Sequence, residues 1–170
     1  MHPENSTPAD IEEIFRFYDL AIAFQKKVSE QHWLPFERAL VEKEVAEKRQ
    51  YKILIDGQIA CIFCIAWNDP LIWGEKDKEP SIYIHRIVTH PDFRGKNFVV
   101  EIINWALPFC RENKRKCLRM DTWGDNLKLR EYYVKCGFTF LNIVKPASPE
   151  LLPAHYSSIS LSLFQIRVSD

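Results

Sequence analysis

The sequence has no net charge, no apolar run of membrane-spanning length and no cysteine framework, and each absence excludes a class of protein. Lysine plus arginine and aspartate plus glutamate both number 23, so the formal net charge of 0 does not favour a general nucleic-acid binder. A basic run, Arg111–Lys116, stands where a helix is expected to end, and it is interpreted as favourable helix-end charge rather than an RNA patch. No nucleic-acid or membrane partner is therefore expected.

The five cysteines are an odd number and show no disulfide-like pattern. Cys61 and Cys64 form a C-x-x-C pair, but they lie in an apolar run typical of a strand, where residues three apart point to opposite faces. No second pair stands at zinc-finger spacing, so we interpret them as buried thiols and predict no metal. The amino-terminal residues lack the apolar core of a signal peptide, and a cytoplasmic protein is the simplest expectation.

The residues that are present predict one folded α/β domain. Hydrophobic residues make up 46% of the 170 residues and aromatics 13%, which excludes a disordered chain and suits a single domain over residues 1–170. Apolar residues recur at helical spacing from Ile11, and Asp56-Gly57 between two strand-like runs predicts a hairpin. The predicted helices cover residues 11 to a break at 31, 35–48, 95–113 and 126–136; the predicted strands cover 51–55, 58–67, 81–90, 117–121, 138–144 and 156–168; loops cover 68–80 and 145–155.

The segment HPDFRGKNFVVEI, residues 90–102, has the layout of a strand end, a short basic loop and a helix start. Backbone amides and the helix dipole at such a helix start can hold a phosphate. Phosphate loops normally carry glycines, whereas this chain has Asn97 and Val99 after Arg94-Gly95-Lys96. Asn tolerates positive φ, and Val99 costs only a few tenths of a kcal/mol if it already lies in the first helical turn with its side chain directed away from the phosphate. The loop is therefore predicted to work, with weaker or shifted cofactor binding; a loop closed to phosphate is the alternative.

A second motif lies downstream, where Asn126 is followed by Tyr133 seven residues later and then by Gly137-Phe138. With the strand, loop and helix before it, this pattern resembles the GNAT superfamily of acyl-CoA-dependent N-acetyltransferases. The resemblance covers most of the chain in element order and residues 81–140 in motif. It implies a central, mixed, mostly antiparallel twisted sheet of about six to seven strands flanked by about four helices.

The resemblance implies transfer of an acetyl group from acetyl-CoA to a primary amine of a small molecule or protein, by direct attack in a ternary complex. Amides of the strand end would polarise the thioester carbonyl, and the loop would bind the pyrophosphate. Asn126 is predicted both to cap a helix and to reach the acetyl-CoA arm. The residues implied in acetyl-CoA binding are Ile87, Val88, Thr89, Arg94, Gly95, Lys96, Asn97, Phe98, Val99, Val100, Asn126 and Tyr133.

Tyr133 stands at the family's position for the acid that protonates the leaving thiolate, whose conjugate acid has a pKa of about 8.5. Apolar periodicity leaves open that Tyr133 and its neighbour Tyr132 are both core residues. For Tyr133 the motif spacing favours the functional interpretation, and for Tyr132 the core interpretation is favoured.

The base that deprotonates the amine is ambiguous in this sequence. Tyr83 replaces the glutamate that histone-acting members carry, while Asp121 matches a carboxylate that some ribosomal-protein acetyltransferases use. Asp121 could instead form an ion pair with Arg119 on the same strand face. His85 lies on the strand face of Tyr83 and could act as base or as a buried, hydrogen-bonded histidine. Water relayed to bulk solvent is a further alternative.

Substrate contacts are predicted from the segment after the first helix and from the late loop. The named candidates are Trp33, His32, Tyr83 and His155, with core packing of the aromatics as the alternative. Few carboxylates gather there, so a strongly cationic acceptor is not favoured. Family members are often dimers, which allows a homodimer. Two other functions stay open: a non-catalytic acyl-CoA-binding domain, and an unrelated α/β binding domain in which RGKNF is a basic surface turn.

Overall fold

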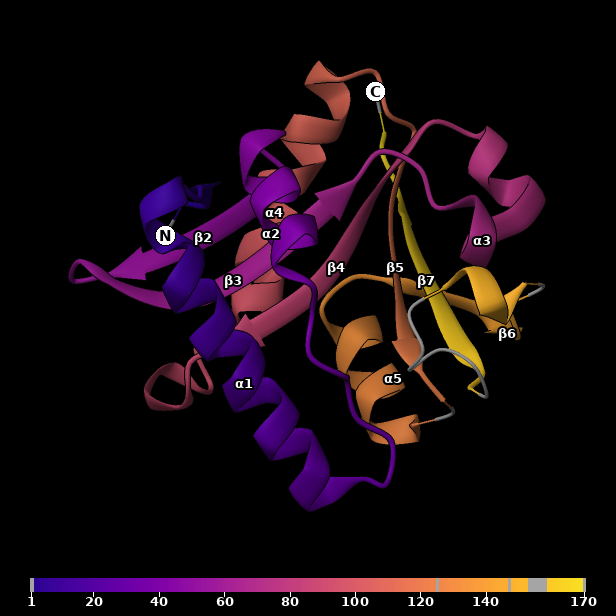
Figure 1. The fold of residues 1–170 in the computed structure, drawn as a ribbon. Helices are drawn as coiled ribbons and strands as arrows, with labels where there is room; N and C mark the ends of the chain where they lie inside the picture. Colours follow the sequence, from indigo (N-terminus) through magenta and orange to yellow (C-terminus); the bar gives the residue numbers. More distant parts are fainter. Residues whose placement is uncertain (1, 125, 147, 153–158, 170) are drawn as a thin grey trace. The chain divides into compact units, whose positions relative to one another are not determined.

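The computed structural model describes residues 2–124, 126–146, 148–152 and 159–169, and it contains a mixed α/β fold (Figure 1). Seven strands form an open, mostly antiparallel sheet in the order β1-β2-β3-β4-β5-β7-β6, in which β4 and β5 are parallel. The strands are β1 (Glu4–Asn5), β2 (Gln50–Ile55), β3 (Gln58–Ala66), β4 (Ser81–Thr89), β5 (Cys117–Trp123), β6 (Thr139–Val144) and β7 (Leu161–Arg167). The helices are α1 (Ile11–Val28), α2 (Arg38–Ala46), α3 (Pro70–Trp73), α4 (Phe98–Glu112) and α5 (Leu127–Lys135).

The predicted fold class is confirmed, with differences at the ends of elements. The predicted loop 68–80 contains α3 and a 3-10 helix, Gly74–Lys78, because Pro70 suits the first turn of a helix. The predicted turn after residue 121 begins later, since Thr122 and Trp123 still pair with β7. β1 was not expected; its two residues pair with β2. The start of the predicted strand 156–168 lies partly outside the described residues.

The chain divides into two compact units, and β4 and α4 contribute residues to both. The first unit comprises residues 1–65 and 86–101. Its β2–β3 hairpin turns at Asp56 and Gly57, whose φ angles of 49° and 78° give the left-handed turn that the pair predicts. Helices α1 and α2 cover the hairpin (Figure 1) and share an apolar core with it, made by Ile14, Phe17, Tyr18, Val41, Val45, Ile62 and Val88.

The second unit comprises residues 66–85 and 102–170. The amino-terminal half of β4 pairs with β5, which pairs in turn with β7, and β7 pairs with β6. One of its buried apolar clusters, within the described residues, consists of Ile72, Trp73, Tyr83, Ile159, Leu161 and Leu163. In the described part of the chain, no helix combines the length and the apolarity needed to cross a bilayer.

The cysteines behave as the sequence predicts. Cys61 and Cys64 are free, buried thiols on β3. Burial raises the pKa of Cys61 to about 12 and that of Cys64 to about 11, so neither is a thiolate at neutral pH.

Candidate active site

The loop between β4 and α4 has the backbone of an anion-binding loop. Gly95 and Asn97 have φ angles of 81° and 53°, and residues 94–97 are exposed. Helix α4 begins directly afterwards at Phe98, and the Asn97 carbonyl accepts a hydrogen bond from the Val100 amide at 2.9 Å. The first amides of a helix have no acceptor within the helix, so they can bind an anion.

Asn97 and Val99 occupy positions that explain how they replace glycine. The left-handed φ of Asn97 is one that asparagine tolerates better than other non-glycine residues. Val99 lies in the first turn of α4 and is buried, so its side chain points into the protein rather than into solvent. The backbone therefore accommodates both residues without glycine, and phosphate binding by the loop stays a prediction.

Arg86 is a feature that the sequence does not reveal. It lies inside β4, directly before Ile87, and has a left-handed φ of 52°, which interrupts the regular strand. Its guanidinium pairs with the buried carboxylate of Glu44 and lies 5.0 Å from the ring centre of Phe36. An arginine with positive φ has no sequence signature; here a buried ion pair holds it in place.

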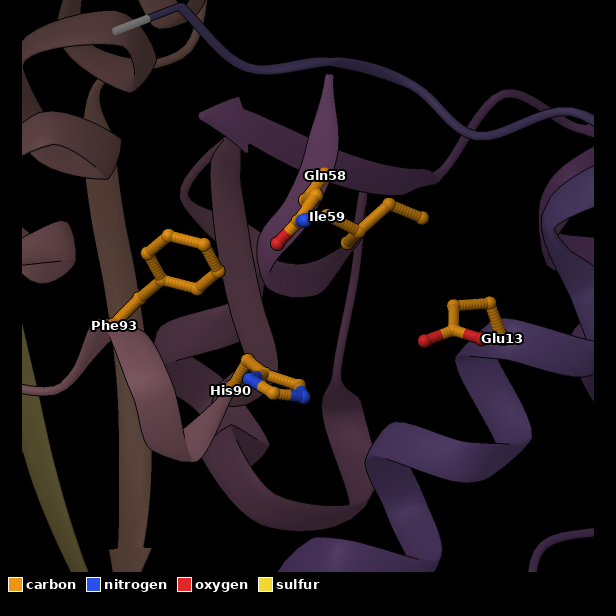
Figure 2. Close-up of a pocket in the computed structure, with 5 residues that line it drawn as sticks. All are labelled: Glu13, Gln58, Ile59, His90 and Phe93. Carbon is orange, nitrogen blue, oxygen red and sulfur yellow. The ribbon is translucent and has the colours of Figure 1, made fainter. Parts of the chain in front are cut away.

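Within the first unit, the loop makes a contact with α1 and borders a pocket. The Arg94 guanidinium stacks on the Phe24 ring of α1, with 4.7 Å to the ring centre. An open pocket of about 280 Å³ lies where the loop begins, lined by Glu13 of α1, Gln58 and Ile59 of β3, and His90 and Phe93 (Figure 2). None of the residues predicted for the site lines this pocket.

In the second unit, Asn126 caps α5 as predicted: its Oδ1 accepts from the Leu129 amide at 3.1 Å. Tyr133 lies two residues before the end of α5, and its ring centre is 5.4 Å from that of Phe164 and 6.3 Å from that of Phe138. Tyr132 is 38% exposed. Tyr133 is thus partly buried in an aromatic setting, and its role in proton transfer stays a prediction.

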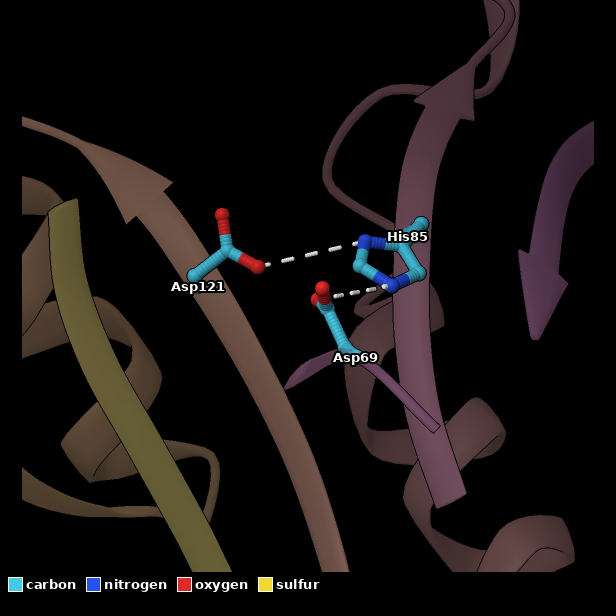
Figure 3. A group of neighbouring side chains, drawn as sticks. All are labelled: Asp69, His85 and Asp121. Atoms are coloured by element: carbon cyan, nitrogen blue, oxygen red, sulfur yellow. Dashed lines mark ion pairs between the residues drawn. The ribbon is translucent and has the colours of Figure 1, made fainter. Parts of the chain in front are cut away.

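The second unit also brings together Asp69, His85 and Asp121 (Figure 3). His85 Nε2 lies 3.5 Å from Asp69 Oδ2, and Nδ1 lies 3.9 Å from Asp121 Oδ1. Three elements supply them: the segment before α3, β4 and β5. The side chains are 13%, 21% and 4% exposed, respectively. Among the described residues, this is the group of three side chains that could hold a metal ion.

The environment of the Asp69–His85–Asp121 cluster disfavours negative charge. Burial raises the pKa of Asp121 to about 7. Burial, with the negative charges of Asp121 and Asp77, raises the pKa of Asp69 to about 8. The oxygens Asp69 Oδ2 and Asp121 Oδ1 are buried without a hydrogen-bond partner. Buried oxygens without a hydrogen bond destabilise the fold, and a catalytic role or the binding of an ion is one explanation for their presence.

Arg119 does not pair with Asp121. Its Nη2 lies 3.0 Å from Glu79 Oε2, and its Nη1 donates to the Tyr83 hydroxyl at 3.0 Å and to the Lys76 carbonyl. Tyr83 is fully buried, so it can contact a substrate only if its neighbours move. The parallel register of β4 and β5, which pairs Tyr83 with Arg119, explains why the next residues on that face, His85 and Asp121, meet.

The structure describes two of the three remaining residues predicted to contact the substrate, Trp33 and His32. Trp33 packs at the edge of the first unit's core, with ring centres 5.5 Å from Phe36 and 6.3 Å from Tyr18. His32 Nδ1 lies 2.9 Å from the Trp33 carbonyl oxygen. His155 lies outside the described residues. Asp69, by contrast, was not predicted, because it stands in a segment expected to be a loop and matches no motif.

Comparison with known proteins identifies the family. The profile of the acetyltransferase (GNAT) family matches residues 10–138, which is most of the chain. The chain therefore belongs to the GNAT family of acetyltransferases. This membership agrees with the resemblance seen in residues 81–140.

Individual relatives are distant. The uncharacterized N-acetyltransferase YesJ of Bacillus subtilis is 27% identical over 43% of this chain and 41% of its own length. The chain thus spans less than half the length of the curated relatives it matches. A GNAT-family acetyltransferase from Listeria monocytogenes superposes with a TM-score of 0.78 at 18% identity, over 97% of this chain and 93% of that one. The Salmonella typhimurium protein yncA, solved with its cofactor acetyl-CoA, superposes with a TM-score of 0.70 at 11% identity, over 100% and 95%.

Proposed function

We propose that the protein is an acetyl-CoA-dependent N-acetyltransferase, which moves an acetyl group to a primary amine of a small molecule or protein. The observation that carries this proposal is the β4–α4 loop, whose left-handed Gly95 and Asn97 lead directly into a helix start. Family membership and the acetyl-CoA-bound relative yncA support the choice of cofactor.

In this proposal, the amides of residues 95–99 hold the pyrophosphate of coenzyme A, and Arg94 and Lys96 add positive charge; the Val100 amide is already bonded to the Asn97 carbonyl. Because these are mainly backbone groups, side-chain identity matters less than backbone conformation. The amides of Ile87, Val88 and Thr89 polarise the thioester carbonyl. Asn126 contacts the acetyl-CoA arm while it caps α5.

The reaction moves protons at both ends: the protonated amine loses two protons to become an amide, one of them before attack, and the leaving thiolate gains one. The amine nitrogen forms a bond to the thioester carbonyl carbon, the carbon–sulfur bond breaks, and coenzyme A leaves as a thiolate. Tyr133 is the proposed acid that protonates this thiolate. An alkyl amine with a pKa of about 10 arrives protonated, and His85 and Asp121 are the proposed acceptors of its proton. Their mutual position on neighbouring strands favours them over an isolated base.

The acceptor is an amine whose contacts include the segment of His32 and Trp33, and His155 is a further candidate. Tyr83 is left out of the proposed contacts because it is buried and bonded to Arg119. A nucleic-acid or membrane partner is not proposed, and a cytoplasmic location and a homodimer stay expectations.

Calorimetric titration with acetyl-CoA, with free coenzyme A as comparison, tests the cofactor assignment. Micromolar binding supports it, and the absence of binding at millimolar ligand refutes it. An amine panel followed by free-thiol release then tests turnover.

The variant Tyr133→Phe separates an enzyme from a non-catalytic acyl-CoA-binding domain. An enzyme is expected to lose about a hundredfold in kcat and to keep its affinity for acetyl-CoA. Tyr132→Phe, on the same helix, is the matched control and should turn over normally. Normal turnover by Tyr133→Phe would reject the acid assignment, and no turnover by the wild type on any amine would favour the binding domain.

A further inference from the structure

The Asp69–His85–Asp121 cluster brings two carboxyl groups together around one imidazole. In the described part of the chain, no lysine or arginine pairs with either carboxylate; Asp69 faces one ring nitrogen of His85 and also bonds to the Ile72 backbone amide, and Asp121 faces the other ring nitrogen. Asp77 adds a third carboxylate nearby, and its Oδ1 accepts a hydrogen bond from the Asp69 amide at 2.7 Å. Buried carboxylates of this kind are usually paired with a cation or bound to a metal.

The second observation is that two oxygens of the cluster have no hydrogen-bond partner, although each lies at ion-pair distance from the His85 ring. Asp121 Oδ1 and Asp69 Oδ2 are buried and unbonded, and the Asp121 side chain is only 4% exposed. Both face the imidazole (Figure 3). Two orphaned acceptors and one ring nitrogen thus converge on the same space from three separate segments.

We propose that Asp69, His85 and Asp121 bind a divalent transition-metal ion of the zinc class. Zinc accepts imidazole nitrogen and carboxylate oxygen ligands at about 2.0 to 2.2 Å, and a site with three protein ligands leaves one position open. A ring nitrogen and two carboxylates suit zinc better than magnesium or calcium, which require shells of oxygen ligands.

The distances make this binding possible with small movements. Two ligand atoms of a tetrahedral zinc site lie about 3.4 Å apart, given metal–ligand distances near 2.1 Å. His85 Nε2 and Asp69 Oδ2 are 3.5 Å apart, and the ligand atoms of all three residues lie within 4.8 Å of one another. Rotation of the side chains, chiefly of the imidazole, therefore closes the site without a change in the strands.

Metal binding at this site would affect the proposed acetyl transfer. Only this consequence rests on the proposed function; the metal site itself does not. The ion would occupy the oxygens and ring nitrogen proposed to accept the proton of the amine. Zinc would then inhibit acetyl transfer while leaving acetyl-CoA binding in place, and a chelator would restore activity. The metal would act as a reversible regulator rather than as a cofactor.

The direct test is calorimetric titration of the full chain with zinc, without acetyl-CoA or amine. We expect one ion per chain and a loss of about tenfold or more in affinity for Asp69→Asn and for Asp121→Asn, which keep the shape of the side chain. The matched control is Asp92→Asn, because Asp92 is exposed and lies 3.7 Å from the ring of His90, which makes it an aspartate–histidine pair outside the cluster. It should bind zinc like the wild type.

Two further measurements keep the outcomes distinct. Affinity should fall as the pH is lowered, because the imidazole and the carboxyl groups must be deprotonated to bind the ion, and binding should release protons. The spectrum of bound cobalt, used as a zinc substitute, should lack a thiolate-to-metal band, which excludes Cys136 and the other thiols as ligands. Equal affinity in all variants, a thiolate band, or no binding at millimolar zinc would overturn the proposal. Because these readouts need no turnover, they stand apart from any failure of the proposed acetyl transfer.

Discussion

The β4–α4 loop and the Asp69–His85–Asp121 cluster differ in which part of the chain supplies their chemistry. The loop is exposed, and its chemistry lies in backbone amides, so it accepts Asn97 where a glycine is usual. The cluster is buried, and its chemistry lies in side chains whose pKa values depend on burial and on each other. We therefore expect the loop to respond to changes in backbone freedom, and the cluster to respond to the loss of a single charged atom.

The largest expected effect is at the cluster. In the presence of a chelator, Asp121→Asn should lower kcat by about a hundredfold or more, because the proton of the amine loses its acceptor. Affinity for acetyl-CoA should stay unchanged, as measured by calorimetry. Asp92→Asn serves as the exposed control. An unchanged kcat would show that Asp121 does not take part in proton transfer. The cluster would then have no catalytic role to compare with that of the loop.

A second change tests what holds the strand that precedes the loop. Glu44→Gln leaves the buried guanidinium of Arg86 without its carboxylate, which should lower the free energy of unfolding by about 3 kcal/mol. Urea unfolding measures this loss. Glu42→Gln on the same helix is the control, because its ion pair with Arg38 is exposed and should be worth about 0.5 kcal/mol or less. Equal losses in the two variants would mean that Arg86 does not depend on Glu44.

The loop itself should show a smaller effect. Gly95→Ala places a side chain on a residue with a φ of 81°, where no atom lies within 4 Å, so the cost is backbone strain rather than a clash. That strain is about 1 to 2 kcal/mol, or roughly tenfold in acetyl-CoA affinity if the loop shifts to relieve it. Asn97→Gly removes the strain of the left-handed φ at position 97 itself, and this variant should bind acetyl-CoA at least as well as the wild type. An affinity of Gly95→Ala equal to that of wild type would show that the loop conformation does not set binding.

The sequence predicted the loop more fully than the cluster, and the reason is physical. Local rules place Gly95 and Asn97 in a turn that leads into a helix, since turn and helix signals act over a few residues, although α4 begins at Phe98 rather than at the predicted residue 95. Asn126 was predicted as a cap for the same reason. Asp69 meets His85 only through tertiary folding, and the left-handed Arg86 depends on Glu44 and Phe36, which are distant in sequence. No local pattern records such contacts, so Asp121 and His85 were named without their partner.

The smallest expected effect is at Asp10, whose carboxylate is paired with a lysine, whereas those of Asp69 and Asp121 are not. Lys52 Nζ lies 2.9 Å from both oxygens of Asp10, and the Thr7 amide donates to Oδ2 at 2.7 Å. Burial favours a higher pKa for Asp10, but these bonds outweigh it and the pKa is lowered. A lowered folded-state pKa means that Asp10 stabilises the fold above its unfolded pKa of about 3.9, and that this stability is lost as the pH falls through the folded value.

Asp10→Asn should therefore lower the free energy of unfolding by about 1 kcal/mol near pH 7, since it removes a charged acceptor from these bonds. The difference from wild type should shrink in acid, as the pH falls through the lowered folded-state pKa of Asp10 and the wild-type carboxyl also becomes neutral. Urea unfolding near pH 7 and in acid measures it, with Asp19→Asn on the exposed face of α1 as control. A difference that stays constant with pH would mean that Asp10 acts through packing alone. The contrast with Asp69 and Asp121, whose pKa values are raised, would then not arise from the presence or absence of a cation.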